Sequence, residues 1–294
     1  MNLTNRQVFI NTKKEINSKE IDVPSSVIND LLLKVNNFES FTDLIVNFDK
    51  EIKDLDLFNS YFDRMKNGEP YQYVINEASF VTLPLYVDKN VLIPRIETEG
   101  LVTIVRKIIE DNNMKHDTIV DMCTGSGCIA LFMKSIYKDS KVLGTDIDIN
   151  ALNVAKRNGK QLSLDVDFIM SDKLDYLLKN HIKCDVFLSN PPYVKNKNDI
   201  EKKVWDYEPR HAVFIENNNL FYEECFKHYK EFLNDKFLMA FEINYDQKDE
   251  LTSLIGKYFK DETTSFVFLK DIYGKDRYLL IEGGYNVNYF EMWL

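Results

Sequence analysis

The second half of the chain alternates short apolar segments with segments of helical period, and this alternation restricts the fold more than any other feature. The segments between the apolar segments either begin with glycines or have the apolar spacing of an amphipathic helix. Buried strands are expected at Thr118–Met122, Lys141–Thr145, Val166–Met170 and Asp185–Ser189. Strands that alternate with helices are typical of parallel sheets covered on both faces. The pattern therefore predicts an α/β domain with a doubly wound, mostly parallel sheet.

Three further strands are expected after a helix over Leu220–Leu233. They lie at Phe237–Ile243, Ser265–Leu269 and Tyr278–Glu282, and they bring the predicted sheet to seven strands. The connection between the last two, Asp271–Asp276, is short enough for a hairpin. The sequence therefore predicts an antiparallel hairpin at the C-terminal edge of the sheet.

The first seventy residues show helical spacing and few glycines. One apolar stripe begins after Pro24, and a second follows Ser40 and Asp43, which have the spacing of a capping box. A third stripe ends at Gly68-Glu69-Pro70, a helix-termination signal. Since no cluster of reactive side chains accompanies these segments, we expect residues 1–70 to form a small helical domain that docks a substrate, with a lid as the alternative.

Between residues 71 and 93 the pattern changes to short apolar segments interrupted by prolines and polar residues. Such segments favour strands, and their shortness indicates a hairpin. We therefore predict a β-hairpin linker over residues 71–93. Residues 94–294 are expected to form the α/β domain, which begins with a helix over Glu97–Asn112.

A glycine-rich loop follows the first predicted strand and opens a helix. Gly125 and Gly127 precede Ala130 in a G-x-G-x-x-A pattern. Glycines there let backbone amides approach a ligand, and the helix N-terminus adds positive potential. Asp146 ends the next strand, where a carboxylate can accept both hydroxyl protons of a ribose. The glycines could serve only a tight turn, and Asp146 could serve only to cap the next helix. Because the loop and the carboxylate occur together at the ends of neighbouring strands, they favour a nucleotide cofactor, either a dinucleotide or S-adenosylmethionine.

A second loop, Asn190-Pro191-Pro192-Tyr193, follows the strand Asp185–Ser189. It should face the same crevice, because ligands of open α/β sheets bind at the carboxyl ends of the strands. The prolines stiffen the backbone and carry no N–H. The Asn190 side-chain oxygen and the Pro191 carbonyl can accept the two protons of one NH2 group, and Tyr193 adds a flat face for a planar amide or base. The loop favours methylation of an NH2 group over hydride transfer; a rigid turn without chemical role is the alternative.

Charge and cysteine content restrict the partners. The chain carries 37 Lys and Arg against 47 Asp and Glu, a net charge of −10, which disfavours stable nucleic-acid binding because that binding relies on basic residues. The four cysteines form no C-x-x-C pair, so free thiols and no metal are expected. Since no apolar run approaches the ~18 residues of a membrane helix and the first residues are polar, we expect a cytoplasmic protein without membrane contact. We also expect it to be a monomer.

With these motifs in place, the chain resembles the class I S-adenosylmethionine-dependent methyltransferases of the release-factor glutamine methyltransferase family. The resemblance covers nearly the whole chain. Asn-Pro-Pro-Tyr is shared with adenine-N6 methyltransferases, whereas the Ile-Pro-Arg-x-Glu-Thr-Glu block at residues 93–99, together with a helical N-terminal domain, is more specific. Further matching segments are Gly68–Pro70, Leu83–Leu85, Asp121–Gly127, Thr145–Asp148, Tyr207–Pro209, Glu242 with Gln247, and Asp271–Arg277.

The resemblance implies a Rossmann-like fold and a defined reaction. A methyl group would pass from S-adenosylmethionine to the side-chain amide nitrogen (N5) of the glutamine in the Gly-Gly-Gln motif of peptide-chain release factors, leaving S-adenosylhomocysteine. Asn190 and the Pro191 carbonyl would hold the glutamine amide, with Pro192 and Tyr193 completing the substrate site. The implied cofactor-binding residues are Cys123, Thr124, Gly125, Ser126, Gly127, Asp146, Asp172, Lys173 and Asn190.

The chain departs from the family pattern at one segment and two single positions. Residues 216–219, Glu-Asn-Asn-Asn, replace the glycine-rich segment that usually follows Tyr-Glu-Pro. Cys123 stands where the family often has glycine, and Lys173 stands where many members have tryptophan. Adenine stacking is therefore not expected at Lys173, although Asp172 can accept a hydrogen bond from the adenine amine. Arg95 and Glu208 fit a structural role as well as a functional one.

Two other functions use some of the same residues. An adenine-N6 or other nucleic-acid amino methyltransferase would share the acceptor loop, but it would need phosphate-binding charge and a pocket for a flipped base. A non-enzymatic cofactor-binding module would be expected to lack Asn190 or the glycine loop, and this chain keeps both.

Overall fold

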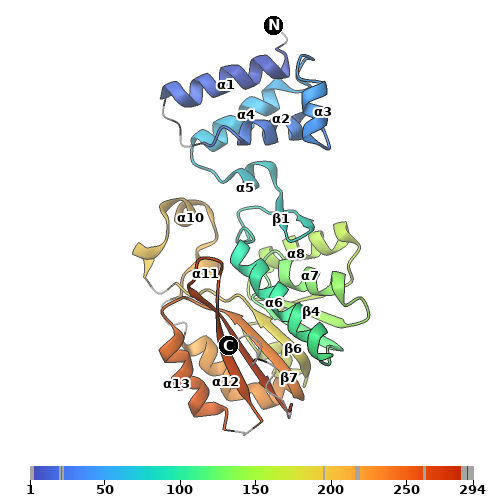
Figure 1. The fold of residues 1–294 in the computed structure, drawn as a ribbon, viewed down its shortest axis with the longest axis vertical. Helices are drawn as coiled ribbons and strands as arrows, with labels where there is room; N and C mark the ends of the chain where they lie inside the picture. The colour runs from blue at the N-terminus through green and yellow to red at the C-terminus, as the bar shows by residue number, and fades with distance from the viewer. Residues whose placement is uncertain are drawn as a thin grey trace. The chain divides into compact units, whose positions relative to one another are not determined.

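The computed structural model describes residues 3–19, 21, 23–194, 196–215, 219–260, 263–285 and 290. The chain divides into two compact units, Met1–Glu77 and Ala78–Leu294 (Figure 1). Each unit buries an apolar core of its own.

The first unit is helical, as predicted for most of its length. The expected capping box is confirmed, since Ser40 Oγ accepts from the Asp43 N–H and Asp43 Oδ2 accepts from the Ser40 N–H. The core includes Leu32, Leu44 and Phe58, each at most 1% exposed. The helices are α1 (Asn5–Lys19), α2 (Val27–Asn36), α3 (Phe41–Val46), α4 (Leu55–Lys66) and α5 (Tyr71–Ile75).

Helix α1 was not among the expected helices, because its apolar residues are sparse. Its buried face carries Asn5 beside Val8 and Ile16. The Asn5 side chain donates to the Asn47 carbonyl at 3.0 Å and accepts from Asn36 Nδ2 at 2.9 Å. A polar residue can face the core here because its hydrogen bonds are made inside the protein.

The predicted linker over residues 71–93 is only partly a hairpin. Residues 71–75 form the helix α5 instead of a strand. Tyr and Val favour strands, but Tyr73 and Val74 are buried as parts of a helical turn that Pro70 opens. Strands β1 (Ala78–Phe80) and β2 (Leu83–Leu85) do pair antiparallel. The first unit therefore extends seven residues beyond the expected boundary at residue 70.

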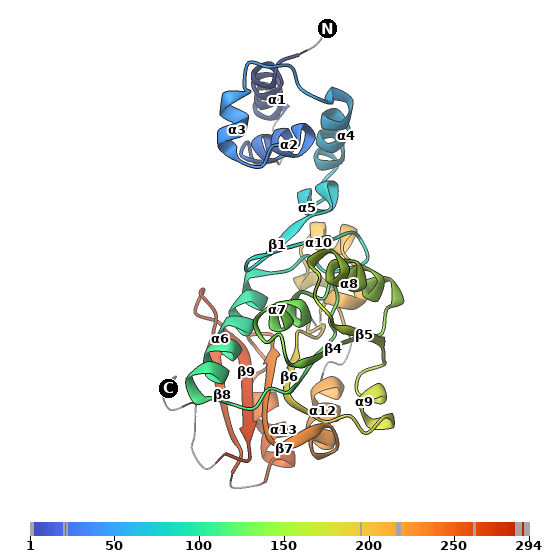
Figure 2. The ribbon, with the colours of Figure 1, turned by 90° about the vertical axis from the view of Figure 1, so that its right-hand side faces the viewer.

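The second unit contains a seven-stranded sheet, and its topology confirms the predicted fold class. The order is β5-β4-β3-β6-β7-β9-β8, and β9 alone runs opposite to the other strands of this sheet (Figure 2). The hairpin β8–β9 lies at the edge, as expected. The strands are β3 (Thr118–Met122), β4 (Lys141–Asp146), β5 (Asp167–Met170), β6 (Cys184–Ser189), β7 (Leu233–Glu242), β8 (Ser265–Lys270) and β9 (Asp276–Gly283).

Strand β7 begins four residues earlier than predicted. Helix α12 ends at Phe232 and passes directly into the strand at Leu233. The polar residue Asn234 is accommodated in the strand because its Nδ2 donates to Asp185 Oδ1 at 2.8 Å.

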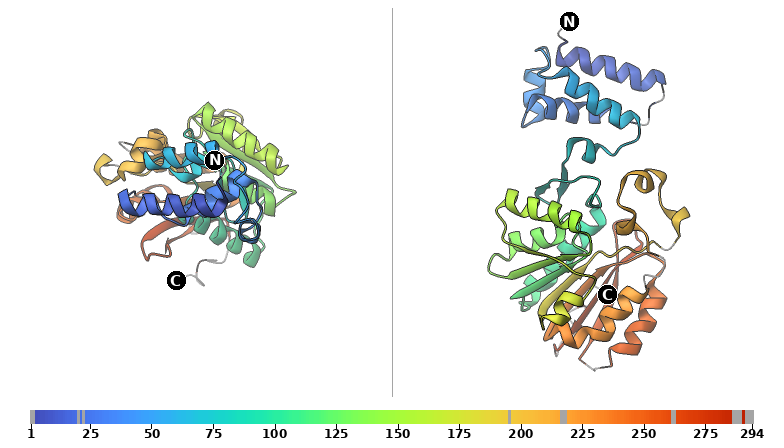
Figure 3. Two further views of the ribbon diagram at one scale, coloured as in Figure 1. Left: turned by 90° about the horizontal axis from the view of Figure 1, so that it is seen from above. Right: turned by 180° about the vertical axis from the view of Figure 1, so that it is seen from behind.

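Helices cover both faces of the sheet, and they lie on either side of the strands in the right-hand view of Figure 3. The sheet therefore has two apolar cores, one on each face. One face carries α6 (Ile96–Asn112), α7 (Cys128–Ile136) and α8 (Ile149–Leu162). The other carries α9 (Asp175–Lys179), α12 (Asn219–Phe232) and α13 (Lys248–Tyr258). In the part of the chain that the structure describes, no helix is both long and apolar enough to cross a membrane.

The connection after β6 is irregular. It carries the 3-10 turn η1 (Lys197–Asp199) and the short helices α10 (Lys202–Tyr207) and α11 (Arg210–Val213). Val194 bridges to Phe214, so the two ends of this connection lie side by side.

Candidate active site

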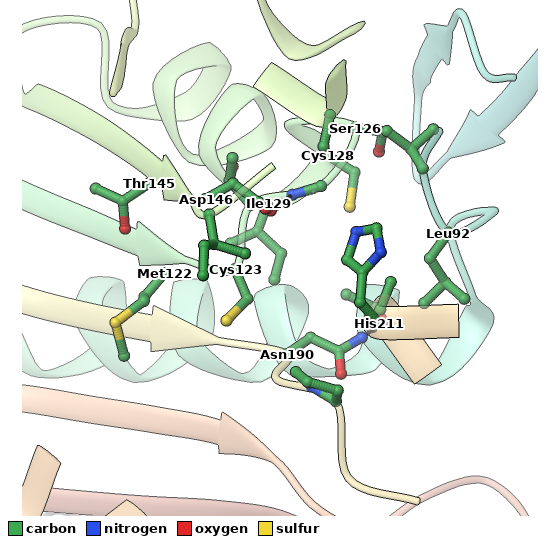
Figure 4. Close-up of a pocket in the computed structure, with 18 of the residues that line it drawn as sticks. Leu92, Met122, Cys123, Ser126, Cys128, Ile129, Thr145, Asp146, Asn190 and His211 are labelled. Atoms are coloured by element: carbon green, nitrogen blue, oxygen red, sulfur yellow. Dashed lines mark hydrogen bonds between the residues drawn. The ribbon is translucent and has the colours of Figure 1, made fainter. Parts of the chain in front are cut away.

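The strand order creates a switch point at β3. Strand β4 pairs with one side of β3 and β6 with the other, all in parallel, and a ligand crevice is expected where the connections diverge. A pocket lies there, lined by the loops that follow β3, β4, β5 and β6 (Figure 4). The segment before α6, the helix α11 and residues of α6, α7, α8 and α12 also contribute to its lining.

The loop after β3 turns its backbone through three left-handed residues, Cys123, Gly125 and Gly127. A Cβ added at Gly125 would meet no protein atom within 4 Å, whereas one at Gly127 would lie 3.0 Å from the Phe168 ring. Glycine therefore serves two purposes. At Gly125 it leaves the loop bare on the pocket side, and at Gly127 it lets α7 begin against the neighbouring residues.

Buried Asp121 supports this loop from the end of β3. Its Oδ2 accepts from Thr124 Oγ1 at 2.5 Å and from the Ala130 N–H at 3.1 Å. Burial raises the pKa of Asp121 to about 7, and these two hydrogen bonds act in the opposite direction. The carboxylate thus joins the loop to the first turn of α7.

Asp146 ends β4 and faces the pocket. Its Oδ2 accepts from the Gly125 N–H at 2.9 Å, and its Oδ1 accepts from the Asp148 N–H at 3.0 Å. Each carboxylate oxygen can accept a second hydrogen bond. Burial raises the pKa of Asp146, and the two backbone hydrogen bonds oppose the rise. The group is therefore held in place with acceptor capacity left for a ligand.

Asn190 begins the loop after β6, and a buried chain of hydrogen bonds holds its amide. Asn190 Nδ2 donates to Thr98 Oγ1 at 2.9 Å, and Thr98 Oγ1 donates to Glu242 Oε2 at 2.6 Å. Thr98 and Glu242 are 2% and 1% exposed. Since the single hydroxyl proton of Thr98 goes to the carboxylate, Thr98 can only accept from Asn190. The Asn190 amide therefore presents Oδ1, an acceptor, to the pocket that it lines.

Tyr193 lies behind this chain rather than in the pocket lining. Its hydroxyl donates to Glu242 Oε1 at 3.1 Å, and the Arg277 guanidinium lies 5.7 Å from the centre of its ring. Burial raises the pKa of Glu242, while hydrogen bonds from Thr98 and Tyr193 and the charge of Arg277 oppose the rise. One carboxylate therefore joins the first and last residues of the Asn-Pro-Pro-Tyr loop.

Lys173 and Asp172 lie in the pocket lining after β5. Lys173 Nζ pairs with Glu224 Oε2 at 2.7 Å, so its charge is partly neutralised by α12. Two thiols also line the pocket, those of Cys123 and Cys128. Burial raises the pKa of both, to about 12 for Cys128, so at neutral pH they are protonated, weakly polar surfaces.

The structure gathers most of the predicted site residues in one pocket. Gly127 lies outside the lining as the N-cap of α7, and Pro191 and Tyr193 also lie outside it. The predicted residues within the lining are Cys123, Thr124, Gly125, Ser126, Asp146, Asp172, Lys173, Asn190 and Pro192.

Arg95 and Glu208 tie two walls of the pocket together. The Glu208 side chain, 2% exposed, pairs with the Arg95 guanidinium and accepts from the Ile93 N–H at 3.1 Å. His211 follows Glu208 by three residues and lines the pocket. Its Nε2 lies 3.3 Å from Asp148 Oδ2. The pair fixes the segment before α6 against the segment that precedes α11.

Sequence reasoning assigned no role to Thr98, Glu242 or His211. The signal for Glu242 was present, because a carboxylate that ends an otherwise apolar strand needs a buried partner. The sequence names no partner, since Thr98 lies 144 residues away. In the described residues no group of three or more His, Cys, Asp and Glu side chains is placed to bind a metal.

Comparison with known proteins gives three findings. A family model described as the methyltransferase small domain matches residues 101–212. The release factor glutamine methyltransferase of Flavobacterium psychrophilum is 35% identical over 247 residues, 81% of this chain and 85% of the relative. That of Staphylococcus aureus is 34% identical over 223 residues, 75% of this chain and 78% of the relative.

Among solved structures, the hMettl16 catalytic domain in complex with the MAT2A 3'UTR hairpin 6 matches with a TM-score of 0.52. It is 15% identical in sequence and covers 70% of this chain and 77% of that one. At this identity the match concerns the fold alone.

Proposed function

Because the chain belongs to the release factor glutamine methyltransferase family, we propose that it methylates the side-chain amide nitrogen of a glutamine in a peptide-chain release factor. The target is the glutamine of the Gly-Gly-Gln motif, and the methyl donor is S-adenosylmethionine. The enzyme is thus a protein-(glutamine-N5) methyltransferase that leaves S-adenosylhomocysteine as its second product.

The pocket fits the cofactor at two points. Asp146 has one free acceptor position on each carboxylate oxygen, which suits two adjacent ribose hydroxyls. The left-handed loop leaves open space at Gly125, where the methionine part can lie against the backbone. Asp172 and Lys173 lie on the adenine side in this proposal. When bound, S-adenosylmethionine supplies an electrophilic methyl group on a positively charged sulfur.

Asn190 and Pro191 then position the acceptor. An amide nitrogen is a poor nucleophile because its lone pair is delocalised into the carbonyl. Asn190 Oδ1 and the Pro191 carbonyl can each accept one of the two amide protons, which withdraws positive charge from the nitrogen and orients its lone pair. Acceptors that are fixed before the reaction stabilise the developing charge without reorganisation.

The observation that supports this proposal most strongly is the orientation of the Asn190 amide. Its NH2 group is engaged by Thr98, so the acceptor edge faces the pocket. A hydride-transfer site has no use for such an acceptor beside its cofactor, whereas an amide NH2 substrate requires one.

The test is a transfer assay with three acceptors. The enzyme is incubated with radiolabelled S-adenosylmethionine and either a release factor, the same factor with its Gly-Gly-Gln glutamine changed to glutamate, or an adenine-containing oligonucleotide. We expect label only in the unchanged release factor. Label in the oligonucleotide alone would favour the alternative function, methylation of a nucleic-acid amino group.

The remaining partner assignments belong to the same proposal. The helical unit, predicted as residues 1–70 and extending to Glu77 in the structure, docks the release factor. The enzyme acts as a monomer in the cytoplasm, without a stable nucleic-acid or membrane partner.

A further inference from the structure

We propose that Thr98 is a positioning residue for methyl transfer, which fixes the edge of the Asn190 amide that meets the substrate, and that Glu242 gives Thr98 the polarity it needs. This inference deepens the proposed function and rests on it. Glu242 lies outside the pocket lining and Thr98 lies within it, and in this proposal both act through Asn190.

The direction of the hydrogen bonds at Thr98 follows from the single proton of its hydroxyl. Glu242 Oε2 accepts at 2.6 Å from a hydroxyl that has only one proton to give, so the Thr98 oxygen is left with lone pairs alone toward Asn190. In a flipped amide, Asn190 Oδ1 would face those lone pairs across the 2.9 Å that now holds a hydrogen bond. The flipped amide would also present an NH2 group to a substrate NH2. Only one orientation is both stable and productive.

Glu242 is surrounded by hydrogen-bond donors and a positive charge. Arg277 lies nearby from β9, where its side chain donates to the Ile243 carbonyl at 3.0 Å and to Asp271 Oδ2 at 3.2 Å. Tyr193 gives Glu242 a second hydroxyl proton. Burial and the negative charge of Glu97 on α6 raise the pKa of Glu242, whereas the hydrogen bonds from Thr98 and Tyr193 and the charge of Arg277 favour its ionised form. An ionised carboxylate has two oxygens for two donors, which is the arrangement found here.

The first turn of α6 is fixed independently of this chain. The Tyr278 hydroxyl donates to the Glu97 carbonyl at 2.8 Å. Gly100 permits this approach, because a Cβ there would lie 2.1 Å from the same hydroxyl. Thr98 is thus carried on a turn that is anchored to β9, so its hydroxyl provides a fixed reference for the Asn190 amide.

The test compares Thr98→Val with Thr98→Ser. Valine keeps the branched shape but removes the hydroxyl, whereas serine keeps the hydroxyl and loses a methyl group. We expect Thr98→Val to lower kcat for release-factor methylation by roughly tenfold or more, since a misplacement of about 1 Å can cost ~100-fold, and Thr98→Ser to recover most of the loss. The Kd of S-adenosylhomocysteine should stay within about threefold, because its contacts come from other loops.

Thr103→Val is the matched control. Thr103 lies on the exposed side of α6, and its hydroxyl bonds only to the Glu99 carbonyl of its own helix. It should leave kcat unchanged. If Thr98→Val also keeps wild-type kcat, or if Thr98→Ser is as poor as Thr98→Val, the positioning role is wrong.

A double-mutant cycle separates orientation from packing. In an Asn190→Asp background both side-chain oxygens are acceptors, so no edge needs to be selected. Thr98→Val and Glu242→Gln should therefore cost much less in kcat there than in the wild-type background, since residues that act through one another are non-additive. Equal losses in both backgrounds would mean that the two residues only support the fold.

A measurement without substrate keeps this inference distinct from the proposed function. The side-chain NH2 resonances of Asn190 in ¹⁵N-labelled enzyme, assigned by their loss in Asn190→Asp, should show one proton protected from exchange. The protection should persist in Thr98→Ser and disappear in Thr98→Val. If the wild-type enzyme methylates no release factor but shows this pattern, the proposed function fails and the positioning of the amide stands. Unprotected protons in the wild type would overturn the inference itself.

Discussion

Replacing Asp146 by alanine should weaken cofactor binding by at least about tenfold. Each carboxylate oxygen already accepts one backbone N–H, from Gly125 and Asp148, and keeps one position for a ribose hydroxyl. Hydrogen bonds to charged groups contribute roughly 1.5–3 kcal/mol each. The pocket is open to water, which competes for the same positions, so we take the lower bound of about 1.5 kcal/mol, and each 1.4 kcal/mol is tenfold in Kd.

Isothermal titration calorimetry with S-adenosylhomocysteine measures this loss directly. Asp167→Ala is the control, since Asp167 is an exposed aspartate at the start of the adjacent strand β5 and lies outside the pocket lining. NAD should give no binding heat with any of the three proteins. Unchanged affinity in Asp146→Ala would show that the ribose lies elsewhere and would refute this reasoning.

The same carboxylate predicts a pH dependence. Burial raises the pKa of Asp146 above its ordinary value, and ribose hydroxyls bind the ionised form. Affinity for S-adenosylhomocysteine should therefore be highest above the raised pKa and should fall as the pH drops through it. In Asp146→Ala this part of the pH dependence should be absent.

Further variants test the acceptor loop, the helical unit and the packing of α6. Asn190→Ala should lower kcat by ~10²–10³ with little change in cofactor Kd, because it removes one preorganised acceptor. Asn190→Asp should retain more activity. Near wild-type turnover of the alanine variant in single-turnover assays would contradict this. The fragment Ala78–Leu294 should bind S-adenosylhomocysteine like the full chain but methylate a folded release factor far more slowly, and an equal rate would exclude a docking role for the helical unit. Gly100→Ala should lower the free energy of unfolding, measured in urea, by ~1–3 kcal/mol through overpacking against the Tyr278 hydroxyl. Adding Tyr278→Phe should recover part of this loss. An unchanged urea midpoint would show that α6 shifts freely.

The architecture of the second unit could be predicted because each strand carries a local signal. Strands β3 and β6 are mostly apolar and almost wholly buried, as parallel strands are, and each is followed by a loop with few conformational choices. The helix α1 gave no such signal, because Asn5 faces its core. Residues 71–75 were misjudged since local propensity favours a strand there, and burial of Tyr73 decides otherwise.

The candidate site was predictable only where neighbours in sequence are neighbours in space. Gly125 and Asn190 lie in loops whose positions follow from the strand order. The partners of Asn190 come from α6 and β7, and no periodicity relates Thr98 to Glu242 across 144 residues. Tyr193 was expected beside the substrate amide. That placement of its ring stays a prediction, and its hydroxyl bonds to Glu242, a contact that depends on packing between strands.

One measurement tests the central claim most directly. The enzyme is incubated with a release factor and S-adenosylmethionine that carries a ¹³CD₃ methyl group, and the peptides are sequenced by tandem mass spectrometry. The account predicts a single labelled methyl group on the side-chain nitrogen of the Gly-Gly-Gln glutamine, present with the wild-type enzyme and strongly reduced with Asn190→Ala. Label on any other residue, or equal label at this glutamine with both enzymes, would contradict it.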